Sequence, residues 1–327
     1  MRKIASLRRA LEKAEKISIA HSAFYKRFTA ELAELVRAAV VRAMTVVAAE
    51  PKQALAGMLR SFKDLVVTDG SVVRLHHLLA SAYRACRTNH TQAAAKLHVV
   101  MSVFGNVPSS VKITDERTHE NKMLKIGKWV KDRLLLFDLG YYDFGLFDRI
   151  DQAGGFFISR LKQKGNPVIT GVNGTGGKPS VNMVGERLRD VLARFKGAVL
   201  DVQVEVRFRR RAYRGKRAWC TCILRVVAVY NLEADRYHIY ITNIPVERLI
   251  AEHVARTYAA RWEIELLFNE MKGYYALEEI PSSSEEVVET LLWATILTSI
   301  VSRTLLAAMR RYYQALDRRI PARRFAA

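Results

Sequence analysis

The sequence has few cysteines, and their arrangement narrows the kinds of protein to which the chain could belong. The three are Cys86, Cys220 and Cys222, an odd number with no paired C-x-x-C spacing. This pattern disfavours a disulfide framework and a zinc site, and it indicates a reducing, cytoplasmic setting. Cys220 and Cys222 fit better as two positions on one face of a strand.

Uninterrupted apolar segments are short as well. The longest, Leu291–Val301, falls below the roughly 20 residues that a membrane-spanning helix requires, and it already contains Thr and Ser. Residues 1–9 are charged and do not lead into the apolar stretch of a signal peptide. We therefore expect a cytoplasmic protein with no membrane partner.

Acidic residues are scarce relative to basic ones. The 327 residues include 32 Asp and Glu against 53 Lys and Arg, which gives a formal net charge of +21. A surplus of this size indicates a polyanionic partner. Because half of the residues are apolar and 26% are charged, the chain can bury a substantial core, which excludes a disordered basic tail.

Apolar periodicity divides the chain into four predicted segments. Residues 1–63 form a helical N-terminal region. Residues 64–164 alternate strands (65–67, 97–103, 110–114, 133–137, 156–161) with helices (120–131, 144–153), as in the first part of an α/β core. Residues 165–245 form an antiparallel β insertion with strands at 199–208, 218–230 and 237–242. Residues 246–327 are helical and supply the second part of the core.

The most informative stretch, residues 258–272, is predicted to be one continuous helix. At about 100° per residue, Tyr258, Arg261, Glu265 and Lys272 fall on one stripe about 60° wide. The stripe borders the apolar face of the helix, so it offers a carboxylate between cations at the edge of the core. The alternative is a surface Arg261–Glu265 pair beside an unrelated lysine.

Two aspartates support the first interpretation. Asp69 and Asp138 each follow an apolar strand, which is where α/β sheets usually place functional groups. Together with Glu265 they could hold two divalent cations for displacement at phosphorus, and ligands that are all oxygen suit Mg²⁺ or Mn²⁺. Taken singly, each Asp is equally compatible with a turn or a helix cap.

The predicted insertion carries a dense basic segment between residues 207 and 217. Strand alternation puts Arg207, Arg209 and Arg211 on one face, a row suited to the phosphates of DNA. The alternative is an exposed hairpin whose charges keep a sheet edge soluble.

These residues resemble a known family. The spacing Tyr258-x2-Arg261-x3-Glu265-x6-Lys272 is similar to the YREK signature of the IS4-type DDE transposases. The segments 68–71 and 137–142 resemble that family's two Asp blocks, and residues 241–245 resemble its approach to the Glu. The resemblance runs from about residue 22 to about residue 306, which is most of the chain.

The resemblance implies a fold and an activity. The fold would be an RNase H-like core with a β insertion between the second Asp and the Glu. Asp69, Asp138 and Glu265 would be the catalytic, metal-binding triad, while Tyr258, Arg261 and Lys272 would contact the transposon-end backbone. The enzyme would be a Mg²⁺-dependent DDE transposase that acts on double-stranded DNA as a homodimer. It would be located in the cytoplasm of a prokaryote, in association with the nucleoid.

Two alternatives to this activity stay open. The chain could be a truncated or domesticated relative that binds DNA without catalysis, because the segments for end recognition and dimerisation are expected to be short or missing. It could also be an RNase H-fold nuclease or resolvase. Short inverted repeats flanking the coding region would favour the transposase.

Overall fold

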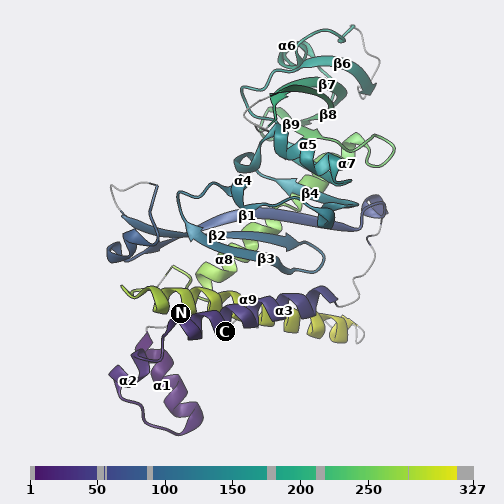
Figure 1. Ribbon diagram of the computed structural model, residues 1–327. Coiled ribbons are helices and arrows are strands. Elements are labelled where there is room, and N and C mark those ends of the chain that lie inside the picture. The colour runs from purple at the N-terminus through teal and green to yellow at the C-terminus, as the bar shows by residue number, and fades with distance from the viewer. Residues whose placement is uncertain are drawn as a thin grey trace. The chain divides into compact units, whose positions relative to one another are not determined.

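The computed structural model is a mixed α/β protein (Figure 1), and it describes residues 4–49, 55, 57–86, 91–174, 182–210, 218–278 and 280–314. The chain divides into two compact units, each assembled from separate segments. The first unit comprises residues 1–52, 70–119 and 263–327, and the second comprises residues 53–69 and 120–262. The predicted boundaries at residues 63, 164 and 245 stay predictions.

The second unit contains a sheet that is mostly buried in β1, β4 and β5. Its strands follow the order β1-β4-β5-β9-β8-β7-β6. Strand β1 is Asp64–Leu75, of which residues 64–69 belong to this unit. It pairs in parallel with β4 (Arg133–Phe137), which pairs in parallel with β5 (Phe156–Arg160). Residues 134–137 of β4 are at most 1% exposed, which explains why this strand is apolar without alternation.

Helix α5 (Phe144–Gln152) connects β4 to β5 and buries an apolar face. The Asp143 carboxylate caps its start by accepting a hydrogen bond from the Leu146 amide, 2.7 Å away. Phe147 of this helix stacks on Phe157 of β5 with ring centroids 4.1 Å apart. The helix thereby covers the strand next to β4 and holds the βαβ unit together.

The β insertion is antiparallel, as the sequence predicted. Strands β7 (Val199–Arg209), β8 (Trp219–Asn231) and β9 (Arg236–Thr242) pair in sequence order, and β9 pairs with β5. Two further elements were not predicted, strand β6 (Val168–Gly174) and helix α6 (Leu188–Arg194). The glycines of residues 171–174 predict a loop, but these residues pair with β7 through two register shifts. Glycines suit such irregular edge positions.

A buried ion pair ties the insertion to the segment after β9. Arg225 and Asp201, both about 3% to 5% exposed, lie on β8 and β7, and the Arg225 Nη2 atom is 2.6 Å from an Asp201 carboxylate oxygen. Arg225 also donates to the carbonyl oxygens of Ile244 and Leu249, at 3.2 and 2.6 Å. Asn173 of β6 donates to the same Asp201 carboxylate.

The first unit combines a hairpin with helices. The rest of β1 neighbours β2 (Ala93–Ser102), which pairs with β3 (Val107–Asp115) across a turn where Asn106 has a φ of 54°. Helices α3 (Ala30–Ala49) and α9 (Glu285–Gln314) lie side by side and pack on β3 (Figure 1). The buried Arg303 of α9 donates to Glu270 of helix α8 (Trp262–Gly273) and to both oxygens of Asn106.

The remaining elements are short or peripheral. Helices α1 (Ile4–Glu15) and α2 (His21–Tyr25) confirm the predicted helical start. Helix α7 (Ala251–Ala259) follows β9. The predicted helix over 120–131 is wrong in extent, because only α4 (Glu120–Met123) and the 3₁₀ turn η3 (Lys128–Val130) form, and the intervening Gly127 is extended. The other 3₁₀ turns are η1 (Gly57–Leu59), η2 (His77–Ser81) and η4 (Leu139–Tyr141).

Helix α9 is the one described helix whose length and composition would allow it to cross a membrane. Its residues 285–313 have a mean hydropathy of 1.6 in the most apolar window. This is weak evidence for a membrane, because core helices of soluble proteins share both properties. Here Val288, Leu292 and Ile296 are fully buried within the first unit, and Arg303 is buried in an ion pair.

We predict that Arg225→Met lowers the free energy of unfolding by about 3–5 kcal/mol, because it leaves the buried Asp201 carboxylate without its cation. Urea unfolding followed by circular dichroism measures this loss. Arg194→Met is the matched control, since Arg194 pairs with Glu186 on the surface and should change stability little. Equal effects of the two substitutions would show that the Arg225 pair does not hold the insertion.

Candidate active site

The register of two parallel strands places Asp69 next to Asp138. Strands β1 and β4 pair from Asp64↔Arg133 to Thr68↔Phe137. Asp69 directly follows Thr68, and Asp138 directly follows Phe137. Neighbouring strands lie about 4.8 Å apart. The structure therefore brings these two predicted site residues together within the second unit.

The prediction that β1 ends before Asp69 is wrong. The strand continues to Leu75, so Asp69 lies within it. The Asp-Gly pair predicted a turn, but Val73 and Leu75 are buried further along the same strand, and this burial outweighs the local turn preference. Asp138, by contrast, does follow the end of its strand, as predicted.

The capping interpretation of Asp138 finds no support. Asp138 occupies the N-cap position of η4, yet its side chain accepts no capping hydrogen bond there. Its backbone carbonyl instead accepts from the Tyr141 amide at 3.1 Å. The carboxylate is therefore not used to start the 3₁₀ turn that follows β4.

Two tyrosine hydroxyls bind the chain beside the aspartates. Tyr258 of α7 donates to the carbonyl oxygen of Phe137, 3.0 Å away, directly before Asp138. Thr68, directly before Asp69, donates to the hydroxyl of the buried Tyr141 at 3.3 Å. Each aspartate thus follows a residue whose position is fixed by an element other than its own strand.

Charge and burial keep both tyrosines protonated at neutral pH. Burial raises the pKa of Tyr258 to about 12; the positive charges of Arg261 and Arg160 act against this rise, and the negative charge of Asp138 adds to it. Burial likewise raises the pKa of Tyr141; the hydrogen bond with Thr68 acts against this rise, and the negative charges of Glu120 and Asp69 add to it. The Tyr258 hydroxyl therefore stays a hydrogen-bond donor to Phe137, and the Tyr141 hydroxyl stays a neutral acceptor for Thr68.

Glu120 is a neighbouring carboxylate that the sequence did not reveal as a site residue. A Cβ atom on Gly140 would lie 2.6 Å from the Glu120 Oε2 atom, so this carboxylate rests against the backbone just after Asp138. This contact has no signal in the sequence, because 18 residues separate Glu120 from Asp138 and the helix predicted there is mostly absent. A side chain at position 140 would displace the Glu120 carboxylate from this place.

The predicted continuous helix over residues 258–272 is wrong. Helix α7 ends at Ala259 and α8 begins at Trp262, with Arg261 in the turn between them. The amides of Ala260 and Arg261 donate to Thr257 and Tyr258 in a final tight turn. The stripe that assumed one helix is therefore interrupted between Tyr258 and Glu265, while Glu265 and Lys272, seven residues apart on α8, share a face.

The residues of this segment have distinct environments. Tyr258 is 5% exposed, and its hydroxyl is engaged by the Phe137 carbonyl, so its predicted contact with DNA has no structural support. The Arg261 guanidinium lies 5.9 Å from the centre of the Tyr258 ring. On α8, in the first unit, Glu265 is half-buried in the first turn and Lys272 forms an ion pair with Glu278 at 2.7 Å. The convergence of Glu265 with the two aspartates stays a prediction.

The basic row of the insertion is partly described. Arg207 and Arg209 are exposed on one face of β7, as predicted, and Arg211 lies outside the described residues. Arg210 has a different role, because it forms two hydrogen bonds with the Asp148 carboxylate of α5, at 2.9 and 3.0 Å. The contact of Arg207, Arg209 and Arg211 with DNA stays a prediction.

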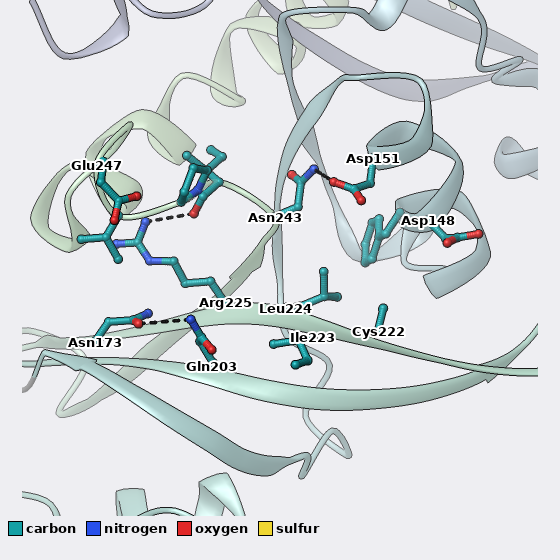
Figure 2. Close-up of a pocket in the computed structure, with 14 residues that line it drawn as sticks. Asp148, Asp151, Asn173, Gln203, Cys222, Ile223, Leu224, Arg225, Asn243 and Glu247 are labelled. Carbon is teal, nitrogen blue, oxygen red and sulfur yellow. Dashed lines mark hydrogen bonds between the residues drawn. The ribbon is translucent and has the colours of Figure 1, made fainter.

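Two cavities in the second unit differ in charge. One, of about 270 Å³, is lined by Asp148, Asp151 and Glu247 together with polar side chains of β7 and β8 (Figure 2). The Arg225 side chain along its wall is already neutralised by Asp201. An acidic lining repels phosphates, and the cavity contains none of the predicted site residues.

The other cavity, of about 620 Å³, includes Leu139, the residue directly after Asp138. Three arginines line it, Arg160, Arg189 and Arg236, and the rings of Phe195, Tyr230 and Tyr237 contribute to its walls. A hollow with this lining suits a polyanionic ligand better than the acidic cavity does.

Carboxylates dominate the candidate site, and their oxygens are the ligands that Mg²⁺ and Mn²⁺ prefer. Asp69 and Asp138 occupy neighbouring positions, and their carboxylates are ligands of the kind that such a cation takes. Within the described ranges, however, no group of three or more His, Cys, Asp or Glu side chains is arranged to hold a metal ion.

Comparisons with known proteins identify relatives. The transposase for insertion sequence element IS231F of Bacillus thuringiensis subsp. israelensis is 22% identical over 286 residues, which cover 77% of this chain and 58% of the relative. The putative transposase InsL for insertion sequence element IS186A of Escherichia coli (strain K12) is 31% identical over 77 residues, which cover 24% of this chain and 21% of the relative. This chain therefore spans little more than half the length of the first relative.

Among solved structures, the cryo-EM structure of the piggyBac transposase synaptic complex with hairpin DNA matches with a TM-score of 0.45 and 9% identity. The match covers 82% of this chain and 52% of the other. A family model described as the transposase DDE domain matches residues 60–301. Because this match covers well over half of the sequence, the chain belongs to the transposase DDE domain family.

Proposed function

We propose that the chain is a DNA transposase that cuts DNA at the ends of an insertion sequence and transfers the freed strands. The observation that carries this proposal is the register of β1 and β4, which sets Asp69 beside Asp138 in a member of the DDE family. The IS231F relative is itself a transposase of an insertion sequence element, and the YREK-like spacing supports assignment to the IS4 type. The family match and this relative support the transposase over the non-catalytic alternative.

The proposal assigns the metal to carboxylates of this chain. Asp69 and Asp138 would share a Mg²⁺ or Mn²⁺ ion, and Glu265 of α8 would complete the triad. When bound, the metal would activate water and stabilise charge at the reacting phosphorus. The protein's own contribution is to hold the two aspartates in place, through the hydrogen bonds that Tyr258 and Thr68 make beside them.

DNA would follow the basic side chains of the site. Arg160 and Arg236 in the cavity beside Leu139 would attract the phosphate backbone near Asp138. Arg261 and Lys272 would contact phosphates close to the cut. The Lys272–Glu278 pair does not oppose this role, because Glu278 is 53% exposed and a surface pair of this kind is weak enough to be exchanged for a phosphate.

The assembly and location follow from the same proposal. The enzyme would act on two transposon ends at once, as a homodimer in the synaptic complex. It would work in the cytoplasm of a prokaryotic cell, associated with the nucleoid, where both its DNA and its divalent cation are available.

We predict that Asp138→Asn keeps DNA binding but lowers Mg²⁺-dependent nicking of the flanking DNA by on the order of 100-fold or more, because it removes a charged ligand without changing the basic surface. Nicking is measured with end-labelled duplex, and binding by fluorescence anisotropy. Asp148→Asn is the control, since this residue pairs with Arg210 away from Asp138. Nicking by Asp138→Asn at the wild-type rate would remove Asp138 from the active site.

We predict that Tyr258→Phe lowers the free energy of unfolding by about 1 kcal/mol, because the Phe137 carbonyl loses its donor, and that it slows nicking without weakening DNA binding. Tyr142→Phe is the matched control, since no hydrogen bond of its hydroxyl is found among the described residues. Weaker DNA binding with unchanged stability would instead support the original prediction that Tyr258 contacts the DNA backbone.

We predict that Lys272→Ala reduces the slope of log affinity against log salt by about 0.9 on duplex DNA, the value expected for one lost phosphate contact. Anisotropy titrations between about 50 and 300 mM salt measure this slope. Glu278→Gln is the matched variant, because it frees Lys272 from its partner and should keep or raise affinity. An unchanged slope in Lys272→Ala would show that Lys272 forms a surface ion pair and does not contact DNA.

A further inference from the structure

The outer face of β7 and β8 carries an unusual group of side chains. Along β7 the inward positions Val204, Val206 and Phe208 are buried, and the outward positions Arg207 and Arg209 are exposed. The antiparallel register sets Arg209 opposite Trp219 and Arg207 opposite Thr221. Trp219 therefore shares the outward face with both arginines, although it lies ten residues further along the chain.

Trp219 contacts both guanidinium groups. Its ring centroid lies 4.5 Å from the Arg207 Cζ atom and 4.6 Å from the Arg209 Cζ atom, within the range of a cation–π contact. The ring remains 52% exposed, so core packing does not account for a large aromatic side chain at this position. The indole instead serves as a surface against which two like charges are held close together.

The contact leaves the arginines able to bind an anion. A guanidinium that rests its face on a ring keeps its N–H donors at the edge, directed away from the ring. Within the described part of the chain, no carboxylate forms an ion pair with Arg207 or Arg209, whereas the adjacent Arg210 forms one with Asp148. Arg207 and Arg209 therefore differ from Arg210 in that their described contact is an aromatic ring and not a carboxylate.

We propose that Trp219 is a positioning residue for DNA binding, which holds the guanidiniums of Arg207 and Arg209 in place for successive phosphates of the DNA backbone. This proposal rests on the proposed function, because it takes DNA as the polyanion. Ordering two long side chains before binding removes part of the entropy that the complex would otherwise lose. Two arginines at alternate strand positions are separated by about 6.7 Å along β7, which spreads the two donors along a backbone instead of onto one phosphate.

The test compares four variants on duplex DNA as a function of salt. Arg207→Ala combined with Arg209→Ala should reduce the log–log slope by about 1.8, twice the value for one phosphate. Trp219→Ala alone should lower affinity about 5- to 30-fold and reduce the slope by at least about half as much as the double variant, although it removes no charge. Trp219→Tyr should restore most of the slope, and Trp219→Leu should not, because only the aromatic ring attracts the cations.

The decisive measurement adds Trp219→Ala to the double arginine variant. We expect no further loss of affinity, because a positioning residue has no effect once the groups that it positions are gone. An additional loss would mean that Trp219 contacts DNA directly, for example by stacking on an unpaired base, and would overturn the proposal. An unchanged slope in Trp219→Ala would overturn it as well.

Two controls separate the positioning role from general electrostatic attraction and from a loss of folding. Arg210→Ala removes the same charge from the residue directly after β7, which pairs with Asp148, and should change the slope less than Arg207→Ala does; an equal change would overturn the proposal in favour of general attraction. Circular dichroism should show an unchanged melting temperature for the Trp219 variants, since the ring is exposed. If nicking with Mg²⁺ is intact while the slopes do not respond, the positioning role fails and the transposase proposal stands; absence of nicking by the wild-type chain would instead refute the latter.

Discussion

The parallel pairing of β1 with β4 is the constraint on which the candidate site depends. Five consecutive residue pairs fix the register, and a shift by one residue would turn every side chain of a strand to the opposite face. Such a shift would set Asp69 opposite Phe137 or Leu139 and would separate the two aspartates. The same apolar contacts that stabilise the sheet therefore determine that the two carboxylates are neighbours.

The tyrosine hydrogen bonds extend this constraint from the strands to the residues beside them. Asp138 lies where β4 gives way to a 3₁₀ turn, a position with no further ladder partner to fix it. The Tyr258 hydroxyl replaces that partner by binding the Phe137 carbonyl. Because the pKa of Tyr258 is raised to about 12, this donor persists across the pH range in which a divalent cation can bind ionised aspartates.

The sequence predicted the elements whose patterns are local and strong. Strand β4 agrees with its expected bounds, α5 and β5 agree within one residue, and the alternating strands of the insertion agree within one or two. The length of β1 was not predictable, because the burial of Val73 and Leu75 depends on neighbours elsewhere in the chain. The break between α7 and α8 was missed because Ala259, Ala260 and Arg261 are all good helix formers.

The site was predictable in part, for the same reason. Asp69 and Asp138 could be recognised from the strands ahead of them, since each is a carboxylate next to an apolar run. Glu120 could not be recognised, because its contact with Gly140 is made through folding over a long sequence separation. The group formed by Trp219 with Arg207 and Arg209 was hidden similarly, since cross-strand register, and not spacing along the chain, brings these residues together.

The net charge of +21 does not measure the surface that is open to DNA. Arg225 and Arg303 are buried and neutralised by Asp201 and Glu270, and both also donate to backbone carbonyls. These cations hold strands and helices together, so replacing them would alter stability before it altered DNA binding. Arg207 and Arg209, in contrast, contact an aromatic ring, which orders a guanidinium without cancelling its charge. Whether a cation contributes to DNA binding therefore depends on whether its partner within the fold is a carboxylate or a ring.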